Sequence, residues 1–246
     1  MAGISVDPKK LLEAGAHFGH KTSRWHPAMR QYIHSKRGDT HIIDLTKTAS
    51  MLDTALEAVT QTVAKGGTVL LTSTKRQAQD KVKEIAESVN MPYVTNRWLG
   101  GMLTNVTTIQ GRVKHLKKLE ERMASGELAA KYSKLEVQRF QEEIDEMNEL
   151  YGGIKEMPAK PAMVFVVDLQ NDKNAVAEAI KLNIPVVGLA DTNVDPRDIT
   201  YPVACNDDAL KTIDLVLDYI KQAIEAGKAQ QKSAKPEKQE ETTKGE

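Results

Sequence analysis

Short aliphatic runs recur along the chain, and segments of helical apolar period lie between them. Continuous apolar residues at 68–72, 162–167 and 184–189 predict buried strands, and the periodic segments at 46–64 and 75–89 predict amphipathic helices. Continuous aliphatic strands that alternate with helices are typical of βαβ units around a parallel sheet covered on both faces. The pattern therefore predicts an α/β fold. It is completed by short strands at 41–44, 92–95 and around Val203, by helices over 172–182 and 207–226, and by a first helix over 9–14 that Asp7 caps.

Residues 104–153 interrupt this alternation with two longer helical patterns. Ser133 and Glu136 form a capping box at the start of the second pattern, and residues 124–132 separate the two. The spacing predicts an inserted antiparallel coiled-coil α-hairpin, in which each helix closes its apolar seam on the other. The seam residues are Val106, Ile109, Val113, Leu116 and Met123 in the first helix and Val137, Phe140, Ile144, Met147 and Tyr151 in the second.

Two further segments fall outside the alternation. Residues 15–40 are rich in Gly, His, Arg and Pro and lack a helical period, so we expect an extended arm there. Residues after 227 contain almost nothing apolar, which predicts a disordered tail because such a segment buries too little surface to offset its ordering entropy. The predicted division is a basic N-terminal helix and arm over 1–40, an α/β domain over 41–103 and 154–226, the hairpin insertion over 104–153, and the tail over 227–246.

Charge is distributed unevenly along the 246 residues, although Lys+Arg and Asp+Glu are both 34. Residues 1–126 hold 19 basic and 11 acidic side chains, a net charge of +8. Residues 127–225 hold 10 basic and 19 acidic side chains, a net charge of −9. This asymmetry indicates that a polyanionic partner binds the basic face of the protein. The apolar runs are too short to cross a bilayer, and a single Cys excludes an internal disulfide, so we expect a soluble cytosolic protein without membrane contact.

The predicted arm concentrates side chains that bind phosphate. Five of the six histidines fall within 25 residues, among the cations Lys21, Arg24, Arg30, Lys36 and Arg37. Imidazoles and cations together suit an RNA backbone, and the Trp25 ring suits stacking on an unpaired base. His17 and His20 could instead share a metal ion, but their cationic neighbours disfavour a divalent cation, so we expect no metal site.

Two other motifs lie at strand-to-helix junctions. Residues 72–76 place hydroxyls, Lys75 and Arg76 at a predicted helix start, where a phosphate of a nucleotide or of RNA would fit. Residues 97–105 contain a Gly-Gly turn and lead into the hairpin. We expect a rigid junction there, built from Trp98, Gly100, Gly101 and the helix cap Asn105, with Arg97 at its base.

Aspartates gather where the predicted strands end. In open α/β sheets this edge binds ligands, so an enzyme that acts on a phosphate ligand with Mg²⁺ is the alternative function. Caps and solvated turns explain the same residues, which are Asp168, Asp191, Asp195, Asp198, Asp207 and Asp208.

Taken in order, several motifs resemble the family of bacterial ribosomal protein two of the small subunit. They are the run 14–20 with Trp25 and Pro27, 74–76, 96–105, 152–155, 184–186, and 191–193 with Asp195 and Pro196. The resemblance covers about residues 5–225. It implies a flavodoxin-like α/β domain, with helices on both faces of its parallel sheet, that carries an inserted coiled-coil hairpin.

The resemblance also implies a structural, non-catalytic role in the small (30S) ribosomal subunit. The expected partners are 16S ribosomal RNA and neighbouring ribosomal proteins, including the messenger-binding protein number one, with no cofactor and no small-molecule substrate. The matched motifs imply RNA contact by His17, His20, Lys21, Arg24, Trp25, Lys75, Arg76 and Arg97, and charge alone adds Arg30, Lys36, Arg37, Arg112, Lys114 and Lys117.

Overall fold

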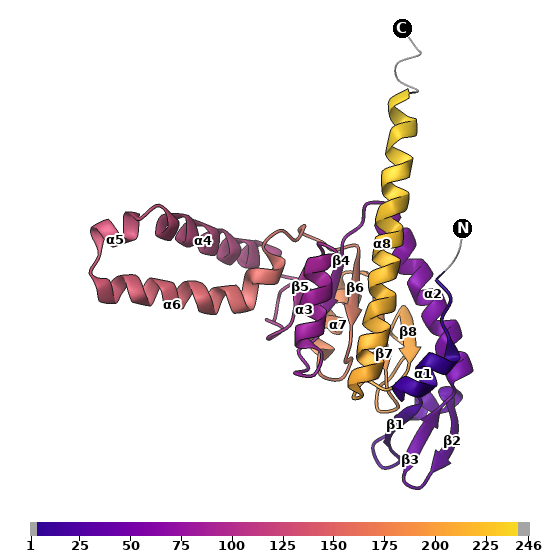
Figure 1. Cartoon of the computed structure of the whole chain (residues 1–246). Helices are drawn as coiled ribbons and strands as arrows, with labels where there is room; N and C mark the ends of the chain where they lie inside the picture. The colour runs from indigo at the N-terminus through magenta and orange to yellow at the C-terminus, as the bar shows by residue number, and fades with distance from the viewer. Residues whose placement is uncertain (1–3, 241–246) are drawn as a thin grey trace.

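A parallel sheet of five strands forms the centre of the molecule (Figure 1). The computed structural model describes residues 4–240, with side chains through Ser233. The spatial order β5-β4-β6-β7-β8 matches the flavodoxin-like doubly wound arrangement, so the predicted α/β fold is confirmed. The strands are β4 (Val69–Thr72), β5 (Tyr93–Val94), β6 (Met163–Val166), β7 (Val186–Ala190) and β8 (Tyr201–Ala204).

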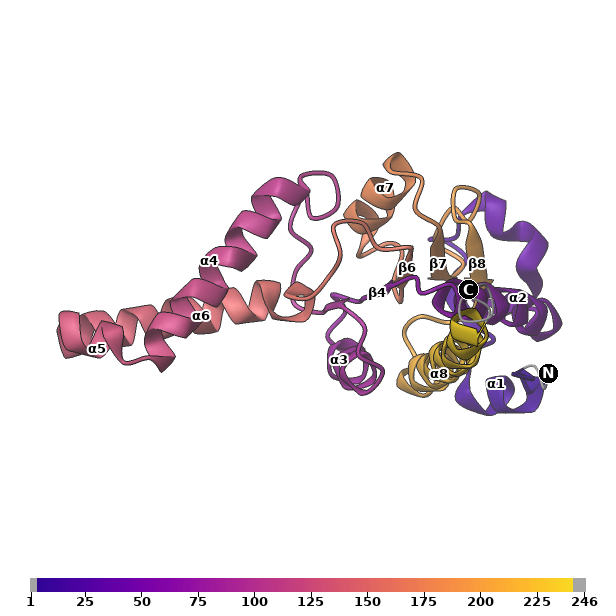
Figure 2. The same cartoon turned by 90° about the horizontal axis from the view of Figure 1, so that it is seen from above.

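Helices cover both faces of this sheet (Figure 2). One face packs against α2 (Leu45–Ala64), α3 (Gln79–Ser88) and α8 (Leu210–Glu240), with α1 (Pro8–Ala14) beside α2 and α8. The other face packs against α7 (Lys173–Lys181) and the segment that leads into the hairpin. Central strands buried on both faces explain why they appear in the sequence as unbroken aliphatic runs.

The segment predicted as an extended arm folds into a second, smaller sheet, so that prediction is wrong. Antiparallel strands β1 (Phe18–Lys21), β3 (Thr40–Ile43) and β2 (Ile33–Arg37) pair in that spatial order, and the 3-10 helix η1 (Pro27–Tyr32) precedes β2. We call this unit the N-terminal sheet. Most of β2 is exposed, so its sequence lacks the apolar alternation that marks a half-buried strand.

The insertion is a pair of long antiparallel helices that projects sideways from the sheet (Figures 1 and 2). It consists of α4 (Val106–Ala124), the short α5 (Glu127–Lys131) and α6 (Lys134–Tyr151), and it returns through the 3-10 helix η2 (Gly152–Ile154). The predicted capping box of Ser133 and Glu136 is present. Between the helices lies a small apolar cluster that includes Leu116 and Ile144, whereas Ile109 and Val113 pack into the core of the α/β domain instead.

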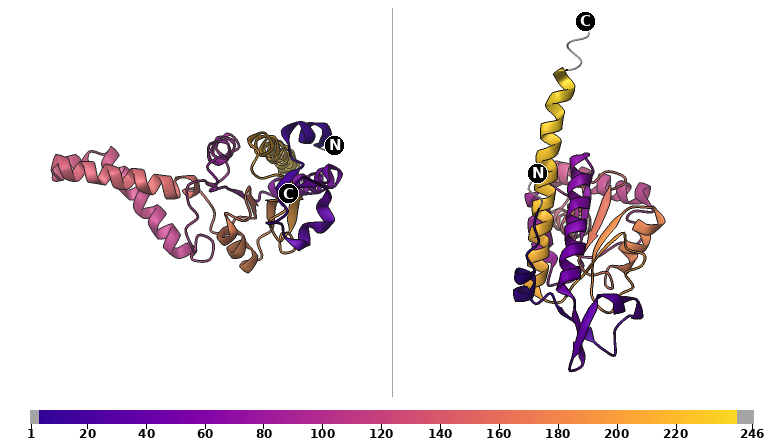
Figure 3. Two further views of the ribbon diagram at one scale, coloured as in Figure 1. Left: turned by 90° about the horizontal axis from the view of Figure 1, so that it is seen from below. Right: turned by 90° about the vertical axis from the view of Figure 1, so that its right-hand side faces the viewer.

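Helix α8 continues well past residue 226, where the sequence predicted that it would end. It reaches Glu240 and extends beyond the sheet, as the right panel of Figure 3 shows. The tail prediction is therefore wrong for 227–240, and its remaining residues, 241–246, lie outside the described residues. No helix in the described part of the chain combines the length and apolar character needed to cross a membrane.

Candidate nucleic-acid interface

The N-terminal sheet is attached to the α/β domain through the loop after β7. The Thr192 hydroxyl accepts a hydrogen bond from the His20 backbone N–H at 2.8 Å, and its carbonyl accepts one from the His26 N–H at 2.7 Å. A Cβ atom at Gly19 would lie 2.6 Å from Thr192 Cγ2. Close backbone approach therefore requires glycine in β1, and Thr192, which is fully buried, fixes where the sheet lies.

The predicted cations of this sheet lie at the protein surface. Within the described residues, none of them forms an ion pair with a carboxylate: they are Lys21, Arg24, Arg30, Lys36 and Arg37. Trp25 is half-buried, with its ring centroid 5.1 Å from that of His41 in β3. Its ring therefore helps to anchor the 22–26 turn to the sheet, and one part of it stays accessible.

The pKa values of the histidines in this region shift in opposite directions. Burial and the neighbouring Arg37 lower the pKa of His17, and burial and Lys36 lower the pKa of His41, so both rings are neutral at pH 7. The hydrogen bond with Asp191 raises the pKa of His20 against the effect of burial. His17 can thus contribute a hydrogen bond to RNA, whereas the His20 ring is directed at the Asp191 carboxylate.

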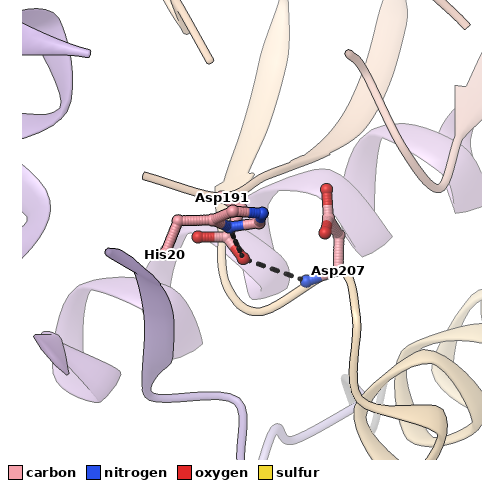
Figure 4. A group of neighbouring side chains, drawn as sticks. All are labelled: His20, Asp191 and Asp207. Carbon is pink, nitrogen blue, oxygen red and sulfur yellow. Dashed lines mark hydrogen bonds and ion pairs between the residues drawn. The ribbon is translucent and has the colours of Figure 1, made fainter. Parts of the chain in front are cut away.

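His20 belongs to a polar cluster at the carboxyl edge of the sheet (Figure 4). Its Nδ1 lies 3.1 Å from Asp191 Oδ2 and its Nε2 lies 3.5 Å from Asp208 Oδ2. One ligand atom each from His20, Asp191 and Asp207 lies within 4.8 Å of the others. This imidazole and carboxylate set can chemically hold a divalent cation, and it pairs His20 with aspartates rather than with His17.

Lys75 lies inside the same cluster. Its Nζ contacts Asp208 Oδ1 at 2.6 Å, Asp207 Oδ1 at 3.0 Å and Asp168 Oδ2 at 3.3 Å. Burial, followed by Asp168 and Asp191, raises the pKa of Asp207 to about 7. The ammonium group predicted to bind RNA is therefore already held by carboxylates of the chain itself.

The strand-to-helix turn at 72–76, predicted to suit a phosphate, is filled by another carboxylate. Asp172, which is buried, accepts hydrogen bonds from the Thr74 N–H at 3.0 Å and the Thr74 hydroxyl at 2.8 Å. This turn lies at the carboxyl ends of β4 and β6, the point where the strand order reverses and doubly wound proteins bind ligands. Because Asp172 and Lys75 fill it, the geometry does not support the phosphate-ligand enzyme.

The remaining predicted cations extend from the sheet edge toward the hairpin. Arg76 and Arg97 are exposed beside the carboxyl ends of β4 and β5, and Arg112 and Lys114 are exposed on α4. Lys117, in contrast, forms an ion pair with Glu156.

The junction of the hairpin depends on a residue that the sequence did not single out. Glu178 of α7 accepts hydrogen bonds from Trp98 Nε1 and from the N–H groups of the turn that contains Gly101, whose φ is +88°. Asn105 precedes α4 as predicted, but its side chain makes no capping hydrogen bond, so that part of the prediction is wrong. A Cβ atom at Gly100 would meet no neighbour, so the described structure imposes no steric need for glycine there.

The model of a known protein family, described as ribosomal protein S2, matches residues 11–227. The chain belongs to the ribosomal protein S2 family. The match includes the N-terminal sheet, the hairpin and the whole parallel sheet, so every part of the interface described above lies within the family's common sequence.

Members of the S2 family from distant bacteria align over most of this chain. The protein named small ribosomal subunit protein uS2 of Dehalococcoides mccartyi (strain CBDB1) is 46% identical over 216 residues, which is 88% of each chain. The protein of that name from Bradyrhizobium sp. (strain ORS 278) is 49% identical over 87% of this chain and 65% of its own length. The protein of that name from Thermobifida fusca (strain YX) is 43% identical over 90% of this chain and 76% of its own.

Proposed function

We propose that the protein is a structural component of the small ribosomal subunit that binds 16S ribosomal RNA. Membership of the S2 family and the names of its relatives, small ribosomal subunit protein uS2, support the ribosomal role. The observation that carries the RNA contact is that nine of the cations predicted to bind RNA are exposed and form no ion pair within the described chain. They are Lys21, Arg24, Arg30, Lys36, Arg37, Arg76, Arg97, Arg112 and Lys114.

The structure divides the fourteen residues predicted to contact RNA by what they already bind. His20, Lys75 and Lys117 are held by carboxylates of the chain, so in this proposal they support the interface from within. His17 and Trp25 are half-buried and offer a hydrogen bond and a ring face. The nine exposed cations named above supply the charge that neutralises phosphates.

The proposed partners include neighbouring ribosomal proteins, and the acidic half of the chain is the surface that suits them. On α6 the residues Glu142, Glu143, Asp145, Glu146 and Glu149 are exposed. Ribosomal proteins that bind RNA are themselves cationic, so this face complements them. Docking of the messenger-binding protein number one belongs to the same proposal, as does a location in the bacterial cytoplasm.

The salt dependence of RNA binding tests the proposed surface. Arg24→Gln, Lys36→Gln and Arg37→Gln together remove three exposed charges without touching a hydrogen bond of the sheet. If each of them neutralises one phosphate, the slope of log K against log salt for a 16S transcript falls in magnitude by about 2 to 3.

A matched control removes the same charge elsewhere. Lys173→Gln, Lys181→Gln and Lys211→Gln change three exposed lysines of the acidic half. We expect this control to keep the slope of the unmodified protein. Equal slopes for the two triple variants would refute the proposed surface.

A further inference from the structure

One carboxylate organises the whole turn between β5 and the hairpin. Glu178 Oε1 accepts from Trp98 Nε1 at 3.1 Å and from the Gly101 N–H at 2.8 Å. Its Oε2 accepts from the Leu103 N–H at 2.9 Å, the Thr104 N–H at 3.0 Å and the Thr104 hydroxyl at 3.1 Å. The backbone of the turn therefore wraps around an anion that belongs to α7, a helix about 75 residues further along the chain.

This contact sets the start of α4. Helix α4 begins at Val106, two residues after Thr104, and the Asn105 side chain does not cap it. Trp98, Met102 and Leu103 are buried in the core on the same side of the sheet as α7. Packing fixes the apolar side of the turn, and Glu178 fixes its polar side. The orientation of the turn therefore determines the direction in which α4 starts.

The second leg of the hairpin has a separate attachment. A Cβ atom at Gly153 would press against the Tyr93 carbonyl oxygen and lie 2.7 Å from Tyr93 Cδ2, so η2 lies directly against β5. Glu120 of α4 accepts from Asn148 at 2.9 Å and from Lys155 at 2.7 Å, which links the two legs.

Figure 2 shows that the two legs leave the domain at separate points and that α4 crosses α6 before the tip. Leu116 and Leu119 of α4, Ile144 of α6 and Leu128 of α5 are buried together between the legs. The Lys117–Glu156 ion pair and the Lys155–Glu120 hydrogen bond also join α4 to the segment after η2, so the direction of the hairpin depends on the attachments of both legs.

We propose that Glu178 is a positioning residue that couples α7 to the hairpin and fixes the direction in which α4 leaves the domain. Ile109 and Val113 anchor the α4 leg in the core by packing, and the carboxylate adds the polar contact that fixes the turn from which α4 starts, so its loss loosens the angle of this leg. A fixed angle keeps Arg112 and Lys114 in register with the cations of the N-terminal sheet. The alignment of these cations matters only if the protein binds RNA as proposed, whereas the fixed angle of α4 does not depend on RNA binding.

Distances between two spin labels test the fixed angle without RNA. Ala129→Cys on α5 and Ser50→Cys on α2 are exposed sites, and the native Cys205 is buried with its pKa raised by that burial, so it stays unlabelled. We expect one narrow distance distribution for this background. We expect Glu178→Gln in this background, which removes one acceptor oxygen and the charge, to broaden the distance distribution. Glu178→Asp keeps the carboxylate, so we expect its distribution to retain part of the narrow component.

Glu142→Gln is the matched control, because Glu142 is exposed on α6 and its side chain accepts a hydrogen bond from Gln138 on the same helix. An unchanged distribution in Glu178→Gln would overturn the proposal. If that variant does not fold, Trp98→Phe, which removes one of the five donors, replaces it and must broaden the distribution as well.

RNA binding then distinguishes the two proposals. We expect Glu178→Gln to weaken binding of the 16S transcript by about tenfold, because two linked contacts lose their fixed geometry. If Glu178→Gln broadens the distance distribution but leaves the RNA affinity unchanged, the angle of α4 has no role in RNA binding. Absence of RNA binding by the unmodified protein overturns the proposed function and leaves the angle measurement valid.

Discussion

Trp98 and Glu178 are 80 positions apart in the chain, yet the indole Nε1 donates to the Glu178 carboxylate at 3.1 Å. The aromatic side chain is 7% exposed, so this hydrogen bond satisfies a polar atom of an otherwise apolar group within the core. The Trp-Leu-Gly-Gly motif thus belongs to a turn whose hydrogen-bond donors surround the Glu178 carboxylate. Its sequence makes physical sense only together with α7.

Removing the indole donor measures the strength of this contact. Trp98→Phe keeps a ring in the core but leaves one fewer hydrogen bond to the Glu178 carboxylate. We expect the free energy of unfolding to fall by about 1 to 3 kcal/mol, from the lost charge-assisted hydrogen bond and the smaller ring. Urea denaturation of Trp98→Phe, Glu178→Gln and the double variant gives the coupling energy, and strictly additive losses would show that the two side chains do not act together.

Acid weakens the Glu178 contact in a defined direction. Burial alone would raise the pKa of Glu178, but the hydrogen bonds from Trp98, Thr104, Gly101 and Leu103 lower it below the usual 4.5. An acid whose pKa is lower in the folded state adds stability above its unfolded pKa and loses it as the pH falls through the folded value. The stability difference between the unmodified protein and Glu178→Gln should therefore be constant near neutrality and shrink below about pH 4.5. A difference that grows on acidification would contradict the contact.

Two glycines of the hairpin should respond oppositely to alanine. A Cβ atom at Gly153 meets Tyr93, whereas a Cβ atom at Gly111, inside α4, meets nothing within 4 Å. Gly153→Ala should destabilise the protein by about 1 to 3 kcal/mol through overpacking. Gly111→Ala should stabilise it by about 0.5 to 1 kcal/mol through helix propensity. Thermal unfolding measures both, and a stabilised Gly153→Ala variant would show that η2 does not lie against β5.

Thr192 holds the N-terminal sheet, and its hydroxyl can be removed almost isosterically. Thr192→Val leaves the His20 N–H without its acceptor, which costs about 1 to 3 kcal/mol. We expect amide hydrogen exchange to rise throughout β1 and β3 and to stay unchanged in β6. Thr54→Val, an exposed threonine of α2, is the control. Uniform acceleration over the whole chain would mean that the sheet has no separate attachment.

The sequence predicted the parallel sheet well because its strands are buried on both faces. Val164, Phe165 and Val166 are fully buried, and a short unbroken apolar run is typical of a strand covered on both faces. The α2 and α4 helices were predicted to within a few residues for a similar reason, since each has one apolar face. Helix α3 starts at Gln79 rather than near Lys75, because Lys75 and Thr74 form tertiary contacts that pull the turn away from helix geometry.

Long-range polar contacts account for most of what the sequence could not show. Nothing local marks Glu178 as different from other glutamates on exposed helix faces, because its partners lie 74–80 positions away. Lys75 appears cationic in the sequence, and only the fold brings Asp168, Asp207 and Asp208 to it. The exposure of the nine cations could be predicted, because a Lys or Arg side chain reaches the surface without a contact to a residue far away in the sequence.

Helix α8 shows a different limit. Residues after Gly227 have almost no apolar content, yet Gly227 lies close to Thr60 and Val63 of α2, where a Cβ atom would approach within 2.7 Å. The helix is therefore still packed at the point where composition predicted that order would end. Extending an established helix costs far less free energy than nucleating a new one, and the composition of a segment does not show whether a helix already precedes it.

Ultraviolet crosslinking in living cells, followed by mass spectrometry of nucleotide-bearing peptides, tests the RNA interface most directly. The proposed interface predicts crosslinked peptides from residues 17–37 of the N-terminal sheet and from the segments around Arg76, Arg97 and Arg112. Crosslinks confined to the acidic helix α6 and the chain beyond it, or none in assembled small subunits, would contradict it.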